Sequence, residues 1–179
     1  QGLYDPAHEH DACGVGMVAH IKGEKSHEIV KQALEILNSI DHRGAVGADP
    51  LLGDGAGLLM QIPDPLMRTW ASEHSLDLPQ PGDYAVAMCF MPQDEAARSM
   101  VAERIEAFTA KEGQRFIGWR DVPTTLDGLG KAVIDSMPVI QQAVVARGEN
   151  TPDQEAFERK LLVIRKQVQN PLAKLAEKH

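Results

Sequence analysis

The sequence predicts a mixed fold in which β-sheets are covered by α-helices, and three observations lead to it. Apolar runs of strand length alternate with amphipathic runs of helix length, a pattern typical of sheets packed against helices. No internal repeat or low-complexity tract interrupts this alternation. Hydrophobic residues make up 43% of the chain and charged residues 25%, which is the composition of a globular protein. The 179 residues are enough for one domain with its own core.

Helices are predicted where a capping residue precedes an apolar stripe. Ser26 and Asp94 are N-cap residues, whose side chains accept a hydrogen bond from the first turn. Asp64 followed by Pro65 is also typical of a helix start. The apolar residues that follow recur every three or four positions, so each helix has one face to bury. The predicted helices cover about 26–40, 64–74, 94–108 and 151–164, and the last of them is highly charged.

Strands are predicted from short apolar runs bounded by turn residues. The run YAVAMCFM at 84–91 is almost wholly apolar, as expected of a central strand. Residues 41–57 instead carry five glycines and no periodicity, which predicts a long shaped loop of the kind that is usually functional. The other predicted strands cover 13–21, 58–62, 115–122 and 137–147.

The charge balance excludes several classes of partner. Lys and Arg number 18 and Asp and Glu number 26, so the net charge is −8 at neutral pH. A chain of this sign repels nucleic acid and anionic membranes, and no local basic patch offsets it. No apolar run approaches the length of about 18 residues that a membrane span requires, and the N-terminus is too polar for a secretory signal. The expected compartment is the cytoplasm.

The two cysteines have different settings. Two thiols are too few for a disulfide framework, a four-cysteine zinc site or an iron–sulfur cluster. Cys89 lies in the middle of an apolar strand and is interpreted as a core thiol. Cys13 stands where the polar leader 1–12 meets a glycine-rich strand, a position at which a side chain faces a cleft.

Cleavage of the bond between Ala12 and Cys13 would unite a nucleophile and a base in one residue. A free α-amine has a pKa of roughly 8 and a thiol one of roughly 8.5. Near neutral pH the amine can therefore take the thiol proton without a histidine.

Two further motifs match binding sites only in part. Gly14 to Ala19 has the spacing G-x-G-x-x-A of dinucleotide folds, but it lies inside a predicted strand rather than between a strand and a helix. His8 and His10 stand among acidic residues and resemble a metal cluster. A solvated leader is the favoured interpretation, because no second cluster completes a coordination sphere, so no metal site is predicted.

Three strings together resemble one known family. They are GLYDPAHEHDACGVGMVAHIKGEKSHEIV at 2–30, HRGAVGADPLLGDGAG at 42–57 and FERKLLVIRK at 157–166. In this order they resemble the class II glutamine amidotransferase domain at the N-terminus of glutamate synthase large subunits. The resemblance implies an α+β fold, a four-layer αββα sandwich of the N-terminal-nucleophile hydrolase type, present here as a partial domain. It also implies that 1–12 is a propeptide and that 13–179 is the N-terminal part of the amidotransferase domain.

The resemblance assigns roles to residues of this chain. Cys13, exposed by removal of the leader after Ala12, would attack the side-chain amide of L-glutamine and form a thioester, releasing ammonia for reaction with 2-oxoglutarate. Arg43 matches the arginine that holds the α-carboxylate of glutamine, a task suited to the guanidinium fork. Asp54, for which the family supplies no role, is expected to support its own loop by accepting backbone hydrogen bonds.

The resemblance also implies partners and cofactors beyond this chain. No cofactor is expected within it, whereas FMN and an iron–sulfur cluster are implied for the full-length enzyme. The expected partners are L-glutamine and the remainder of the synthase chain, in the cytoplasm or, in a plant or alga, the plastid stroma. The Asn-Gly pair of the family's oxyanion hole does not occur here, so these residues alone are expected to be a weak or inactive glutaminase.

Two other functions stay open from the sequence. One is a non-catalytic module that binds glutamine or another protein and never unmasks Cys13. The other is a phosphate-binding module in which the GDGAG loop around Asp54 cradles an anion. The absence of a lysine from that loop disfavours this second alternative.

Overall fold

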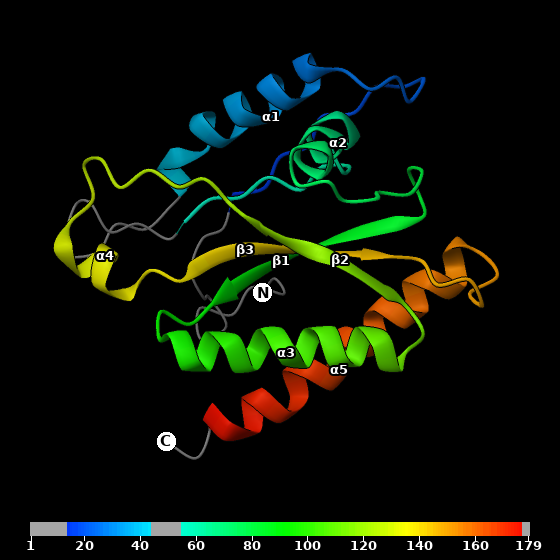
Figure 1. The fold of residues 1–179 in the computed structure, drawn as a ribbon. Coiled ribbons are helices and arrows are strands. Elements are labelled where there is room, and N and C mark those ends of the chain that lie inside the picture. Colours follow the sequence, from blue (N-terminus) through cyan, green and yellow to red (C-terminus); the bar gives the residue numbers. More distant parts are fainter. Residues whose placement is uncertain (1–13, 44–54, 177–179) are drawn as a thin grey trace, which may run out of the picture. The chain divides into compact units, whose positions relative to one another are not determined.

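The computed structural model describes residues 14–43 and 55–176 (Figure 1). The chain divides into two compact units. The first unit contains helix α1 (His27–Ser39), the 3₁₀ turn η2 (Asp41–Arg43) and most of helix α4 (Lys131–Ser136). The second unit contains a three-stranded sheet and three helices. Its elements are α2 (Asp64–Glu73), β1 (Tyr84–Met91), α3 (Glu95–Lys111), β2 (Arg115–Asp121), β3 (Val139–Ala146) and α5 (Gln154–Ala176).

Helices α1, α2 and α3 begin where the sequence predicts them. Ser26 Oγ accepts a hydrogen bond from the Ile29 amide at 3.4 Å, and Asp94 Oδ1 accepts one from the Ala97 amide at 2.8 Å. Both predicted N-caps are therefore confirmed. Helix α5 begins three residues later than expected, and its first turn donates to Asp153 Oδ1.

The sheet is antiparallel, with β3 between β1 and β2. Tyr84 on β1 and Arg115 on β2 both pair with Ala146, at opposite edges of the central strand. The strand predicted at 84–91 is confirmed at both ends, and those at 115–122 and 137–147 are confirmed within two residues. A register shift between Phe116 and Gly118 gives β2 a bulge.

Helix α2 covers one face of this sheet, and α3 and α5 cover the other (Figure 1). Gly118 faces this layer: a Cβ at this position would lie 3.3 Å from Leu76 Cδ1, a tight contact, and 3.6 Å from the Trp70 ring, an ordinary one. The Tyr84 hydroxyl donates to Asp64 Oδ1 at 2.8 Å and ties β1 to the start of α2, and burial raises the pKa of Tyr84 above its usual range. The core on this face consists of Met67, Trp70, Ala71, Leu78, Tyr84 and Val144.

The opposite face packs against α3 and α5. Trp119 on β2 donates its indole N–H to Glu106 of α3 at 2.8 Å. Phe157 of α5 and Thr109 of α3 are fully buried, as is Ala143 on the central strand. The mixed fold predicted from the sequence is thus confirmed, with helices on both faces of a small antiparallel sheet.

Two predicted strands are wrong for the residues that are described. The parts of the runs at 13–21 and 58–62 that the structure describes are not strands, and no β-ladder includes them. Val15 is 91% exposed, although a buried strand was expected there, and Leu59 is 99% exposed. A strand needs hydrogen bonds from a neighbouring strand, and no described residue provides them here. The short helix α4, in contrast, was not predicted.

Candidate functional site

Most of the predicted site lies outside the described residues. This holds for the leader 1–12 with Ala12, for Cys13 and for Asp54. Arg43 is described only as the last backbone position of η2, and its side chain lies outside the description. The structure therefore describes the segments that flank the site, in the unit that contains α1.

The segment that follows Cys13 in the sequence runs against α1. A Cβ added at Gly16 would lie 2.2 Å from Ile36 Cγ2, closer than two carbon atoms can approach. Only glycine fits at this position without a shift of the helix or the segment. The glycine-rich character of this stretch therefore has a packing cause in the structure.

The segment that leads into Arg43 is the end of the same helix. The Ile40 amide donates to the Ile36 carbonyl at 3.0 Å, and Ser39 Oγ donates to the Glu35 carbonyl at 2.8 Å. His42 Nδ1 lies 3.1 Å from the Ser39 carbonyl, so this ring nitrogen is the donor. These local bonds end the helix and form the turn before Arg43. Helix α1 thus connects the stretch around Gly16 with the approach to Arg43.

The second cysteine of the chain is poorly suited to nucleophilic chemistry. Cys89 lies on β1, is half-buried, and has its sulfur 3.5 Å from the Ala87 carbonyl oxygen. Burial raises the pKa of the Cys89 thiol, which lowers its thiolate fraction at neutral pH. Cys89 is not among the buried residues of the core, so the interpretation as a core thiol holds only in part, and Cys13 stays the candidate nucleophile.

The described part of the chain contains no group of three or more His, Cys, Asp or Glu side chains that could hold a metal ion. The cluster around His8 and His10 belongs to the residues that are not described. Among the helices that the structure describes, none is both long and apolar enough to cross a membrane.

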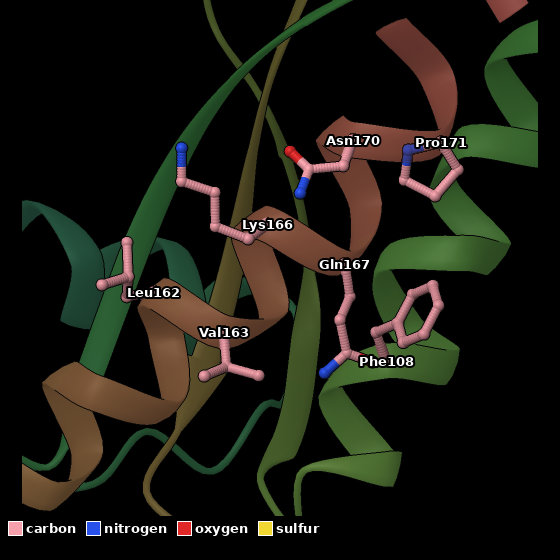
Figure 2. Close-up of a pocket in the computed structure, with 7 residues that line it drawn as sticks. All are labelled: Phe108, Leu162, Val163, Lys166, Gln167, Asn170 and Pro171. Carbon is pink, nitrogen blue, oxygen red and sulfur yellow. The ribbon is translucent and has the colours of Figure 1, made fainter. Parts of the chain in front are cut away.

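Two hollows occur in the second unit, and sequence reasoning identified neither. One, of about 420 Å³, lies between α2 and β2, where Arg120 donates to Gln142 Oε1 and His74 Nδ1 bonds to the Trp70 carbonyl. The other, of about 480 Å³, lies between α3 and α5 (Figure 2). In the sequence, the only feature that indicates the hollow between α3 and α5 is the adjacent apolar pair Leu162 and Val163 in a charged helix. Neither hollow is lined by a predicted site residue.

Comparison with known proteins identifies the family. The model for class II glutamine amidotransferases matches residues 13–179. The chain therefore belongs to the class II glutamine amidotransferases, and the resemblance drawn from the three strings is confirmed.

The curated relatives that the chain matches are named glutamate synthases. The chain is 45% identical over 170 residues to the glutamate synthase [NADPH] large chain of Bacillus subtilis, a match that covers 95% of this chain and 11% of that protein. It is 40% identical to glutamate synthase [NADH] of Schizosaccharomyces pombe, over 97% of this chain and 8% of that protein. It is 39% identical to ferredoxin-dependent glutamate synthase 1, chloroplastic/mitochondrial, of Arabidopsis thaliana, over 96% of this chain and 10% of that protein. The chain thus spans about a tenth of the length of these curated relatives.

Proposed function

We propose that this chain is the glutaminase part of a glutamate synthase, in which Cys13 hydrolyses the side-chain amide of L-glutamine. The observation that carries the proposal is the family match beginning at Cys13, together with relatives named glutamate synthase at 39–45% identity. The raised pKa of Cys89 supports the choice of thiol.

The chemistry requires Cys13 at the N-terminus of the mature chain. After removal of 1–12, the free α-amine accepts the thiol proton, and the thiolate attacks the side-chain carbonyl carbon of glutamine. The C–N bond then breaks, ammonia leaves with a proton from the amine, and a γ-glutamyl thioester remains. Water attacks this thioester and releases glutamate and the thiol. The domain limits that follow are a propeptide at 1–12 and an amidotransferase segment at 13–179.

In this proposal Arg43 orients the glutamine substrate. A guanidinium donates two parallel hydrogen bonds to a carboxylate and so fixes both position and direction of the amino acid. The turn η2 supports this role, because the bonds of Ser39 and His42 determine where the backbone of Arg43 leaves α1. Asp54 supports its loop by accepting backbone hydrogen bonds.

We infer that the complete domain is the four-layer αββα sandwich of the N-terminal-nucleophile hydrolases. The described sheet, with α3 and α5 packed on one face, would supply one β-layer and one α-layer of this sandwich. Phe90 on β1 is 68% exposed and Met88 is 50% exposed, and by strand alternation both share the face of Tyr84, which α2 covers only in part. Their exposure supports a second sheet over the rest of that face. The exposure of Val15 and Leu59 likewise fits segments whose strand partners are supplied by other parts of the domain.

The remaining steps belong to the rest of the synthase polypeptide. Ammonia released at Cys13 would react there with 2-oxoglutarate, and FMN and an iron–sulfur cluster would be bound there. The two cysteines of this chain cannot provide the four thiolates of a typical cluster. Such an enzyme would work in the cytoplasm or in a plastid stroma, and the chloroplastic relative supports the second possibility.

A glutamine analogue with an electrophilic ketone in its side chain tests the proposal. Incubation with the complete enzyme, followed by peptide mass spectrometry, is expected to find the adduct on Cys13. Excess glutamine is expected to prevent it, and Cys89→Ser is expected to leave it unchanged. An adduct on Cys89, or retention of 1–12 with no adduct at all, would replace the proposal with a non-catalytic glutamine-binding module.

A further inference from the structure

The groove between α3 and α5 is apolar and open to solvent. It has a volume of about 480 Å³, and its walls are Phe108 from α3 and a stripe along α5 (Figure 2). Leu162 is 53% exposed and Val163 is 41% exposed on this stripe. Helix α5 buries its opposite side, with Phe157 and Ile164 in the core, so the groove is a second apolar surface of the same helix.

Among the residues described, the one charged residue in the groove lining is positive, and two more cations lie over its Phe108 wall. Lys166 is part of its lining. The Arg104 guanidinium lies 5.8 Å from the centroid of the Phe108 ring, and Lys111 Nζ lies 5.3 Å from it. No lining residue is acidic, although the chain as a whole carries a charge of −8.

The polar groups at this surface differ in whether they have hydrogen-bond partners. Glu112, at the end of α3, already accepts hydrogen bonds from Lys160 and Gln167. Arg104 Nε, in contrast, is buried without a hydrogen-bond partner among the described residues. This atom lies beneath the surface and Arg104 is not among the residues that line the groove, so the cations open to an occupant are Lys111 and Lys166.

We propose that a segment of the same polypeptide from outside residues 1–179 packs in this groove, with apolar side chains on Leu162 and Val163 and carboxylates beside Lys111 and Lys166. The proposal rests on the proposed function, since the named relatives are about ten times longer than this chain. An amphipathic helix in an apolar groove is a common form of recognition, and the cations select an acidic one.

The size of the groove favours a tethered occupant over a second copy of the chain. A stable interface between separate proteins buries about 1,000 Å² or more, and a hollow of 480 Å³ takes only a few side chains. A segment of the same polypeptide is held at a high effective concentration and needs much less contact area.

Thiol labelling of the complete enzyme tests whether the groove is covered. Val163→Cys lies in the groove, and Arg165→Cys is a matched control, exposed on the same helix but outside the lining. We expect a maleimide to react with Val163→Cys at least about tenfold more slowly than with Arg165→Cys under native conditions, and equally fast after denaturation. Equal native rates would overturn the proposal.

Charge reversal tests the acidic character of the occupant. Lys166→Glu is expected to speed the labelling of Val163→Cys, whereas Arg165→Glu, the same charge change beside the groove, is expected not to. Equal effects of the two reversals, or none from either, would contradict an acidic segment.

Cross-linking identifies the occupant. A photoreactive phenylalanine analogue at Leu162 in the complete enzyme is expected to give a within-chain adduct with an acidic peptide from outside residues 1–179. Adducts of twice the chain mass, adducts to another protein, or adducts only within 1–179 would overturn the proposal. Labelling of Cys13 by the glutamine analogue is a separate readout, so a failure here does not depend on the glutaminase assignment.

Discussion

Gly148 and Gly113 meet where the end of the sheet passes the end of α3. A Cβ at position 148 would lie 1.8 Å from the Gly113 carbonyl oxygen, a distance that no side chain tolerates. The Gly148 amide also donates to Gln114 Oε1 at 2.9 Å. The chain can therefore pass from β3 towards α5 only because residue 148 has no side chain.

Gly148→Ala is expected to destabilise the protein through this contact. Backbone atoms must move to relieve the clash, so we expect a loss of about 1–3 kcal/mol or more in the free energy of unfolding. For a chain of this size about 1 kcal/mol corresponds to roughly 2–4 °C in Tm, which a thermal melt resolves. Gly57→Ala is the control, because a Cβ at Gly57 meets nothing within 4 Å. An unchanged Tm for Gly148→Ala would show that the two glycines do not meet.

Thr151→Val is expected to cost about 1–3 kcal/mol of stability, although valine has nearly the same shape. Gln114 Nε2 donates to Thr151 Oγ1 at 2.9 Å, and both residues are only 6% exposed. The substitution leaves the buried amide of Gln114 with one partner fewer. Thr69→Val is the matched control, since the Thr69 hydroxyl is exposed and bonds only within its helix. Denaturant titrations should separate the two variants, and equal midpoints would argue against the buried network.

Glu112 is expected to make stability depend on pH. Its hydrogen bonds from Lys160 first, and then from Gln167, hold the pKa of the Glu112 carboxyl below its usual value. The ionised carboxylate therefore stabilises the fold above the unfolded pKa of about 4.3, and this contribution is lost as the pH falls through the lower folded pKa.

The variant Glu112→Gln removes that charge, and its single amide oxygen keeps one of the two hydrogen bonds while the NH2 group replaces the other acceptor. We expect the Tm difference between the wild type and Glu112→Gln to be steady from about pH 7 to 5 and to close below about pH 4. Glu158→Gln, on the exposed side of α5, is the control for a general charge effect. A Tm difference that grows as the pH falls would reverse the sign and contradict the assignment.

Cys13 is expected to remove its own leader. The thiol attacks the Ala12 carbonyl carbon, and the acyl group moves from nitrogen to sulfur, which breaks the C–N bond and frees the α-amine. Water then cleaves the thioester, which releases the leader with a carboxyl end and restores the thiol. Intact-mass analysis of the purified protein should show loss of residues 1–12 in the wild type and in Cys89→Ser, and retention in Cys13→Ala. Loss of the leader from Cys13→Ala would mean that another agent cleaves it.

Arg43→Lys is expected to weaken glutamine binding rather than chemistry. A lysine cannot form the paired hydrogen bonds of a guanidinium, so KM for glutamine should rise about ten- to a hundredfold. The kcat of the complete enzyme should change little, because the amide is distant from the α-carboxylate. Arg120→Lys, in the hollow between α2 and β2, should leave KM unchanged. A rise for Arg120→Lys instead would move the carboxylate site to that hollow.

The elements that the sequence predicted well depend on local interactions. The caps at Ser26 and Asp94 are bonds to residues three positions ahead, so the residue types alone indicate them. The apolar run at 84–91 likewise predicted a strand at its observed bounds. The runs at 13–21 and 58–62 carry similar signals but form no ladder in the described residues, because strand pairing depends on a partner distant in sequence.

The candidate site likewise has features that local sequence predicted and features that depend on contacts between distant segments. Residue strings predicted the family and pointed to Cys13 and Arg43, since a motif is a local property of the sequence. They did not predict the groove between α3 and α5, which exists only because Phe108 and Val163, far apart in the sequence, line the same space. Nor did they predict the order β1-β3-β2 or the contact of Gly148 with Gly113. By itself the sequence determined the starts of α1, α2 and α3, three strands and the family. The tertiary structure decided which strands pair, which glycines are indispensable and which apolar surface stays open, because each depends on contacts between segments that only folding brings together.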